Sequence, residues 1–392
     1  MPTSFEITLI HCSDIHLSER LIEDTENHIP HRHGHDMRAF LALDDYLKRT
    51  PWDVLVISGD LSRVGNRDSL SWARNWLNTT LYLGSYELGL GLAKQDDKLV
   101  VTVPGNHDRF NGSLTQGALD NYTNEFGAVP VNETVSTVIR GTKLNFHLYD
   151  STFAGGGFGR GRIADLYMVP KRISIDELNI AILHHYFIQP PKHNRTLDLE
   201  LDNCNAVAAY LLSVGFDAIM FGHLHERYID YISGKLIARL LPRRRERRKV
   251  WRRLIPRRVA AMFEEDGAVS YRRERAANGQ APSLEAHYEY IFMKRHGAEV
   301  FGPQHFKTIK HFYQHLSENR EAFSLKAELD RLKQKKVLIS MAPSACQAEA
   351  PMFGLQRFVF RGHNGRIEEF ECYHVDFDEA HFLESTIPSF GH

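Results

Sequence analysis

The stretch Leu99-Val100-Val101-Thr102-Val103-Pro104, followed by Gly105-Asn106-His107-Asp108, decides how the rest of the sequence is interpreted. Its first part is apolar, rich in β-branched residues and closed by a Pro-Gly pair, which predicts a strand that ends where a loop begins. The loop then presents an amide, an imidazole and a carboxylate in consecutive positions. Asn and Asp are also common in turns, so residues 105–108 taken alone fit an ordinary turn as well as a reactive loop.

Further apolar runs along the chain also predict strands, at Phe5–Cys12, Trp52–Ser58, Lys143–Tyr149, Asn179–Leu183 and Phe216–Phe221. Residues with helical spacing lie between them, at 36–49, 67–82, 112–126 and 203–213. Strand patterns return late in the chain, at 336–341 and in a predicted hairpin of residues 356–360 and 367–375. Strands that alternate with helices predict a layered α/β protein with its site at the strand ends.

The strand ends carry side chains that suit metal binding, namely Asp14, His16, Asp60, Asn106, His184 or His185, His223 and His225. Carboxylate, imidazole and amide oxygen, without thiolate, suit borderline divalent ions such as Mn, Fe, Co or Zn. In Asp-x-His and His-x-His, the two outer residues of an extended segment point the same way. Two metal ions about 4 Å apart need a shared carboxylate, and Asp60, alone at its strand end, is the natural bridge.

Five blocks, in this order, resemble the motifs of the calcineurin-like metallophosphoesterase superfamily: Asp14-Ile15-His16, Gly59-Asp60, Gly105-Asn106-His107-Asp108, His184 and Gly222-His223-Leu224-His225. The resemblance covers about residues 5–231 and, more faintly, 336–375. It implies a four-layer α/β/β/α sandwich of two mixed sheets with flanking helices. The chain then divides into a catalytic domain of residues 1–234 and 336–392 and a basic, mainly helical insertion at 235–335.

The resemblance also implies a role for each residue. One metal ion would be held by Asp14, His16, Asp60 and His225, and the other by Asp60, Asn106, His184 and His223. A hydroxide that bridges the two ions would attack phosphorus in line. His107 would stabilise the transition state or protonate the leaving oxygen. Asp108 would orient His107, because a histidine with a carboxylate partner keeps a proton available near neutral pH.

Three features leave alternatives open. His184 directly follows the apolar strand and is preferred as the ligand, which makes His185 a residue that supports the ligands or faces the substrate. The cluster of His28, His31, His33 and His35 matches none of the blocks, and we favour a surface loop near the site, where histidines can contact phosphate, over a third metal site. The glycine-rich loop at 155–161 lacks the P-loop pattern and is interpreted as a flexible turn.

The predicted insertion begins with a strongly basic tract. Between Arg239 and Arg258, ten Arg and one Lys accompany a single Glu, about +10, so the rest of the chain carries about −11 of the net charge of −1. Apolar residues recur at helical spacing through 250–263. Residues 239–263 would then pack on the catalytic body or a second subunit, or bind an anionic membrane surface. We rank nucleic acid lower as a partner, because no base-reading motif accompanies the arginines.

Four cysteines without a CxxC pair favour free thiols in a reducing compartment. No signal peptide and no apolar run of about 20 residues is visible, so we expect a cytoplasmic protein, or one held peripherally at the membrane. The expected function is metal-dependent hydrolysis of a phosphate ester, with a phosphodiester favoured. The alternatives are a nuclease or nucleic-acid-binding protein and a non-catalytic member that keeps the fold. A protein phosphatase is disfavoured because its arginine-bearing motifs are absent.

Overall fold

The computed structural model describes residues 4–18, 36–109, 119–152, 215–233, 336–346 and 352–386, together with parts of 161–187 and 201–214. Within these ranges it does not describe residues 84, 96, 132, 364–365 and 379–380. The predicted insertion at 235–335 and the cluster from His28 to His35 lie outside the described residues. None of the helices within the described ranges combines the length and the apolar character that a membrane span requires.

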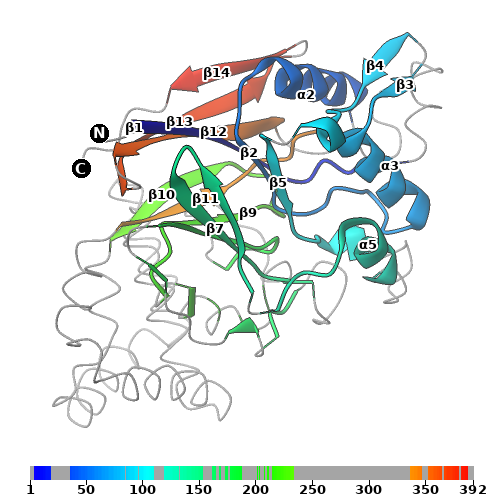
Figure 1. Cartoon of the computed structure of the whole chain (residues 1–392). Coiled ribbons are helices and arrows are strands. Elements are labelled where there is room, and N and C mark those ends of the chain that lie inside the picture. Colours follow the sequence, from blue (N-terminus) through cyan, green and yellow to red (C-terminus); the bar gives the residue numbers. More distant parts are fainter. Residues whose placement is uncertain are drawn as a thin grey trace, which may run out of the picture.

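The first sheet joins strands from both ends of the chain, in the order β14-β13-β12-β1-β2-β5 (Figure 1). Its strands are β1 (Ser4–Cys12), β2 (Val54–Ile57), β5 (Leu99–Thr102), β12 (Gly354–His363), β13 (Arg366–Phe377) and β14 (Phe382–Thr386). β1, β2 and β5 run parallel, whereas β12 pairs antiparallel with β1. The predicted late hairpin is confirmed, because β12 and β13 pair antiparallel.

The second sheet has the order β10-β11-β9-β8-β7-β6. Its strands are β6 (Val135–Ile139), β7 (Thr142–Leu148), β8 (Leu178–Ile182), β9 (Ala218–Phe221), β10 (Tyr228–Ser233) and β11 (Lys336–Met341). β7, β8, β9 and β11 run parallel, and β6 and β10 are antiparallel edge strands. β10 and β11, which precede and follow residues 235–335 in the sequence, are therefore neighbours in this sheet.

Helices cover the outer face of the first sheet. They are α2 (Met37–Arg49), α3 (Arg67–Asn78) and α5 (Leu119–Phe126), with a one-turn α4 (Asn106–Arg109) and a 3-10 helix η2 (Leu92–Lys94) between them. Side-chain caps start the first two, because Asp36 accepts from the backbone of Arg38 and Ala39, and Asn66 accepts from Ser69. Phe40 of α2 and Trp76 of α3 are buried on the helix faces that pack against this sheet.

The helix predicted at 67–82 extends too far, because α3 ends at Asn78 and not at residue 82. The chain continues as a small hairpin of β3 (Leu81–Leu83) and β4 (Tyr86–Leu88). Residues 79–83 are β-branched, aromatic or leucine, and this local β preference ends the helical periodicity. Of the helix predicted at 112–126, residues 112–118 lie outside the described residues, and residues 119–126 form α5.

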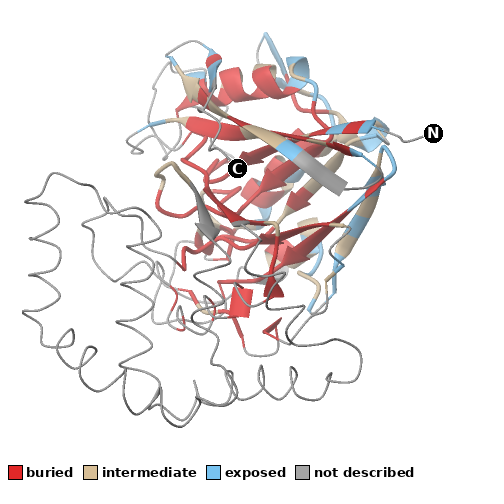
Figure 2. Cartoon of the chain, turned by 90° about the vertical axis from the view of Figure 1, so that its left-hand side faces the viewer, coloured by how far each residue is buried: buried red, intermediate tan, exposed pale blue. Residues whose placement is uncertain are grey.

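The two sheets pack face to face, and alternate residues of one strand serve different layers. Ile180 and Ile182 of β8 pack in the cluster between the sheets with Leu9 of β1. Ala181 of the same strand faces the opposite way, into a cluster that contains Tyr210. Figure 2 shows this burial running through both sheets. The predicted α/β character with mixed sheets is confirmed, whereas the four-layer description and the insertion stay predictions.

The parallel strands of both sheets end on one side of the molecule, and backbone hydrogen bonds extend beyond them. Asp14 N donates to Gly59 O and His16 N donates to Asp60 O, both at 3.0 Å. In the second sheet Gly222 N donates to His184 O at 3.1 Å. The loops that follow the strands are therefore held in register with each other.

A chain of buried polar groups joins the two sheets behind these loops. Ser340 on β11 donates its hydroxyl proton to the side-chain oxygen of Gln356, so it accepts from His11 Nδ1, which lies 2.7 Å away. His11 Nε2 then accepts from the hydroxyl of Ser58 at 3.0 Å. The carbonyl oxygen of Ser58 in turn lies 2.8 Å from Nδ1 of His184, a predicted metal ligand. The network therefore connects the core to the strand-end loops.

Burial lowers the pKa of His11 from 6.5 to about 3. The folded pKa lies below the unfolded one, so only the unfolded chain takes up this proton between pH 6.5 and about 3. Stability therefore falls as pH decreases through that window. From pH 7 to pH 5 the loss due to His11 is about 2 kcal/mol. We expect His11→Gln to lack this part of the pH dependence when urea unfolding is measured at both values.

The matched control is His381→Gln, which replaces an exposed histidine and should keep the wild-type pH dependence. The other buried histidines are common to all three proteins, so the difference between them isolates His11. An equal loss of unfolding free energy in wild type and His11→Gln would contradict the assignment of a buried, neutral imidazole.

Candidate metal centre

Five of the predicted ligands have a left-handed backbone, with φ between 50° and 73°: Asp14, His16, Asp60, His223 and His225. Arg140 is the one other non-glycine residue with positive φ in the described part of the chain. This conformation is uncommon outside glycine, although Asp and His tolerate it better than most residues. Each instance costs on the order of 1 kcal/mol. The strand ends therefore store backbone strain where the predicted ligands sit.

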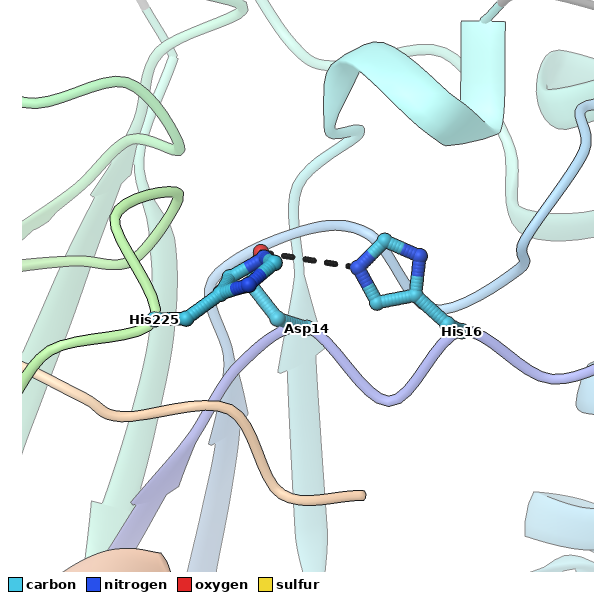
Figure 3. A group of neighbouring side chains, drawn as sticks. All are labelled: Asp14, His16 and His225. Carbon is cyan, nitrogen blue, oxygen red and sulfur yellow. Dashed lines mark ion pairs between the residues drawn. The ribbon is translucent and has the colours of Figure 1, made fainter. Parts of the chain in front are cut away.

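Asp14, His16 and His225 form one group of potential metal ligands. His225 Nε2 lies 3.1 Å and His16 Nε2 lies 3.8 Å from the same oxygen, Asp14 Oδ1. Figure 3 shows Asp14 between the two imidazoles, which come from loops after β1 and β9. The other carboxylate oxygen, Oδ2, accepts from the backbone of His223 at 3.0 Å. One oxygen is thus fixed by the backbone and the other is directed at the histidines.

Asp60, Asn106, His184 and His223 form a second group. His184 Nε2 lies 3.2 Å from Asp60 Oδ2, 3.0 Å from Asn106 Oδ1 and 3.1 Å from His223 Nδ1. All four residues are buried. Each offers one oxygen or nitrogen atom to the same small volume, which is the arrangement of a polydentate cation site.

Asp60 connects the two groups. Its Oδ2 lies 3.2 Å from His184 Nε2 in the second group and 3.8 Å from His16 Nε2 in the first. Its Oδ1 accepts from the backbone of His107 at 2.8 Å. The carboxylate therefore presents a single oxygen to both sets of imidazoles, as a bridging ligand requires.

The first group fits a cation because it contains buried polar atoms that the protein does not satisfy. Asp14 Oδ1 and His16 Nε2 are buried and make no hydrogen bond within the described residues. An unsatisfied buried carboxylate oxygen is expensive. A cation placed among Asp14, His16 and His225 would compensate these atoms directly.

The second group fits a cation because it brings acceptors together. His184 donates from Nδ1 to the carbonyl of Ser58, so Nε2 of the neutral ring is an acceptor that faces Asp60 and Asn106. Burial opposes protonation, but Asp60 raises the pKa of His184 to about 9. A proton therefore occupies Nε2 in the metal-free protein. A divalent ion would replace that proton and satisfy the same acceptors.

The carboxylates remain ionised although they are buried. Burial raises the pKa of Asp14, but the positive charge of His225 and the nearby imidazole of His16 hold that pKa well below its usual value. Burial likewise raises the pKa of Asp60, and the neighbouring His184 and His107 hold it below its usual value. Two ionised, buried carboxylates among histidines give the site the negative charge that a pair of cations requires.

Glycines in the motifs allow this close approach. A Cβ on Gly105 would lie 2.1 Å from Asp60 Oδ1, and a Cβ on Gly59 would lie 2.4 Å from His184 Nδ1. Gly59 also has φ of +102°, which favours glycine. Gly59 and Gly105 are therefore needed because a predicted ligand occupies the place of the side chain that either residue would otherwise carry.

The structure corrects the expectation that Asp108 orients His107. The carboxylate of Asp108 accepts from the backbone of Leu61, Ser62 and Gly105, and from the Ser62 hydroxyl, over 2.7 to 3.2 Å. His107 Nδ1 instead lies 2.8 Å from the carbonyl oxygen of Arg63. A carboxylate that saturates backbone donors cannot also bind the ring. Asp108 thus holds the loop of Leu61 and Ser62, which leads to Arg63.

His107 itself lies beside the first group. Its ring centroid is 4.5 Å from that of His16, in an edge-to-face arrangement. His107 is also among the described residues that come close enough to His16 and Asp60 to contribute to a cation site. The structure therefore brings together all seven predicted ligands and His107, while their roles as ligand and acid stay predictions.

Sequence reasoning missed the groups that support the ligands. Ser58 and Arg63 contribute carbonyl oxygens to His184 and His107, and any residue type has a carbonyl. Ser151 is different, because its hydroxyl accepts from the backbone of both His184 and His185, at 3.2 and 3.1 Å. It follows β7, a predicted strand, so its place at a strand end was a signal that could have found it.

Replacement of Asp60 should affect both groups, whereas replacement of His225 should affect one. We expect Asp60→Asn to reduce bound metal from about two ions per chain to well below one, because a neutral amide bridges two cations poorly. His225→Ala should retain about one ion. Metal content is measured by mass spectrometry after equilibration with Mn²⁺ and gel filtration.

The matched control is Asp45→Asn, which removes an exposed carboxylate of α2 that pairs with Arg49, and it should keep the wild-type metal content. If Asp60→Asn retained both ions, the bridging role of Asp60 would be wrong. If His225→Ala lost both, the two groups would not be separable sites.

Comparison with known proteins adds a family match. A family model described as calcineurin-like phosphoesterase matches residues 7–227. No curated protein matches the sequence. Similar solved structures include a dimetal phosphatase from Danio rerio, with 11% identity, coverage of 98% of this chain and 99% of that chain, and a TM-score of 0.41.

Two further similar structures cover less of this chain. Phosphopantetheinyl hydrolase from Mycobacterium tuberculosis has 16% identity, coverage of 57% of this chain and 85% of that chain, and a TM-score of 0.32. GAP50, described as the anchor in the inner membrane complex of Plasmodium, has 14% identity, coverage of 57% and 68%, and a TM-score of 0.31. These structural similarities are weak, and the assignment rests on the match to residues 7–227.

Proposed function

This chain belongs to the calcineurin-like phosphoesterase family, and we propose that it hydrolyses a phosphodiester with two divalent metal ions, chosen from Mn, Fe, Zn and Co. The observation that carries the proposal is the pair of ligand groups that share Asp60 Oδ2. When bound, two such ions would activate a water nucleophile and offset negative charge on the phosphoryl group.

The protein's own contribution begins with orientation. The hydrogen bond from His184 Nδ1 to the Ser58 carbonyl directs the Nε2 lone pair into the site. The backbone N–H of His107 donates to one oxygen of Asp60, and the backbone N–H of His223 donates to one oxygen of Asp14. The second oxygen of each carboxylate therefore points to the histidines. Pre-oriented ligands reduce the reorganisation needed during reaction.

His107 is proposed to donate the proton that the leaving oxygen requires. Its Nδ1 is engaged by the Arg63 carbonyl, which leaves Nε2 as the nitrogen that exchanges a proton with the substrate. The ring lies against His16 at the edge of the first ligand group. An imidazole held in this way is suited to general acid catalysis near neutral pH.

A diester is favoured over a monoester by the charges around the site. Arg109 and Arg227, which follow two of the motifs, are already paired with Asp150 and Asp376. They are therefore not available to neutralise the second negative charge of a phosphomonoester.

The proposal predicts a preference for bis(p-nitrophenyl) phosphate over p-nitrophenyl phosphate, by at least about tenfold in kcat/KM at pH 7. Asn106→Ala should reduce this activity by about 100-fold or more, because it removes a ligand from a two-metal site. Asn78→Ala, at the C-terminal end of α3, is the control and should hydrolyse the diester at the wild-type rate. A faster monoester reaction would indicate a phosphomonoesterase. Absence of both metal and hydrolysis would indicate a non-catalytic member of the family.

The proposed role of His107 predicts a dependence on the leaving group. We expect His107→Ala to slow the release of an alkoxide by about 100-fold or more, since that oxygen needs a proton. Release of p-nitrophenolate, which leaves without protonation, should slow much less. The measurement compares methyl p-nitrophenyl phosphate with a dialkyl phosphate under single-turnover conditions. Equal losses for both leaving groups would show that His107 stabilises the transition state by charge alone.

A partner for the basic tract is a separate proposal. Residues 239–263 lie outside the described residues, and the proposal is supported by their positive charge. We propose an anionic membrane surface or a second subunit as the partner, which would make the protein a cytoplasmic or peripheral membrane enzyme. Nucleic acid is the second candidate, and a salt-dependent gel shift that persists in Asp60→Asn would favour it.

A further inference from the structure

His185 is the buried histidine of the site that neither ligand group uses. It follows His184 at the end of β8, yet its ring is not among the atoms that surround Asp60. The side chain is fully buried, and its Nε2 atom has no hydrogen-bond partner within the described residues. A buried ring nitrogen without a partner is unfavourable, so a hydrogen-bond partner from outside the protein is expected.

The hydrogen bonds of Ser151 determine which nitrogen of His185 carries the proton. The Ser151 hydroxyl oxygen accepts from the backbone N–H groups of His184 and His185, and these use its two lone pairs. Its single proton must therefore point to His185 Nδ1, which lies 2.9 Å away. Nδ1 is an acceptor, so Nε2 bears the proton of the ring. The unpartnered atom is consequently a donor.

This donor lies next to the second ligand group. The centroid of the His185 ring is 4.4 Å from that of His223 and 5.1 Å from that of His184. The opposite edge of the ring is closed by Gly161, where a Cβ would lie 2.6 Å from His185 Nδ1. The backbone around Gly161 thus covers the edge that carries Nδ1. The edge that carries Nε2 is therefore the one at which a ligand atom can accept a hydrogen bond.

We propose that His185 is a substrate-positioning residue whose Nε2–H donates a hydrogen bond to a non-bridging oxygen of the phosphoryl group. This inference rests on the proposed function, because it places the phosphoryl group beside His184 and His223. An anionic oxygen is the appropriate acceptor, since hydrogen bonds to charged groups are stronger than those to neutral ones. The interaction would also persist in the phosphomonoester product, and inorganic phosphate, which carries the same non-bridging oxygens, serves as its probe.

The test measures the dissociation constant of inorganic phosphate by calorimetry, in protein reconstituted with Mn²⁺, together with the metal content. His185→Leu removes the donor, and we expect it to keep both ions and to bind phosphate about 10-fold to 100-fold more weakly. His185→Gln can place an amide N–H near the same position and should restore affinity to within about threefold of wild type.

His147→Leu is the matched control, since it replaces another buried histidine of the same sheet, on β7, whose ring contacts that of Phe216 in a tilted arrangement. It should leave phosphate affinity unchanged. Unchanged affinity in His185→Leu, with both metals retained, would overturn the inference and leave the proposed function intact. Wild-type protein that bound neither metal nor phosphate would instead overturn the proposed function.

A second measurement covers the case in which His185→Leu loses metal or fails to fold. In zinc-loaded wild-type protein with ¹⁵N-labelled histidines, the Nε2–H resonance of His185 is assigned by its loss in His185→Gln. Addition of phosphate should shift this resonance to lower field. A resonance that did not move at saturating phosphate would show that the ring only packs against His223, and the inference would be wrong.

Discussion

Asp60 can serve both ligand groups because one of its oxygens is kept away from them. The backbone N–H of His107 holds Oδ1, so Oδ2 is directed toward His16 and His184 together. This placement requires that residue 105 has no side chain, since a Cβ there would overlap Oδ1. The short loop after β5 thus contributes a glycine that makes room, an N–H that fixes the bridge and the neighbouring histidine itself. The rest of the site is arranged around that carboxylate.

The interface between the sheets supports the same arrangement. A dry core would hold the sheets together by apolar packing alone, yet His11, Ser340 and Gln356 place a hydrogen-bonded chain inside it. Ser58 joins this chain through its hydroxyl and binds His184 through its carbonyl. The directional bonds specify how one sheet lies on the other, because a small rotation would break them. The predicted metal ligands of the two sheets are therefore positioned by the same hydrogen-bond network.

The sequence alone predicted the juxtaposition of the ligands, because parallel strands bring their carboxyl ends to one edge and polar residues follow each of them. It did not predict the partner of His107. Asp108 is adjacent and chemically suitable, but it is occupied by the backbone of Leu61 and Ser62. The partner of the His107 ring is instead the carbonyl oxygen of Arg63. Every residue type has such an oxygen, so the sequence cannot indicate which one binds. The end of α3 was misplaced for a related reason, since apolar spacing did not reveal the β preference of residues 79–83.

The left-handed backbone at the ligands has a consequence for how this protein can change. At each of these five positions glycine would relieve the strained conformation and remove a metal-binding group in the same step. Variants chosen only for resistance to heat can therefore gain stability by losing these side chains. Evolution in the laboratory must retain a requirement for turnover at every round.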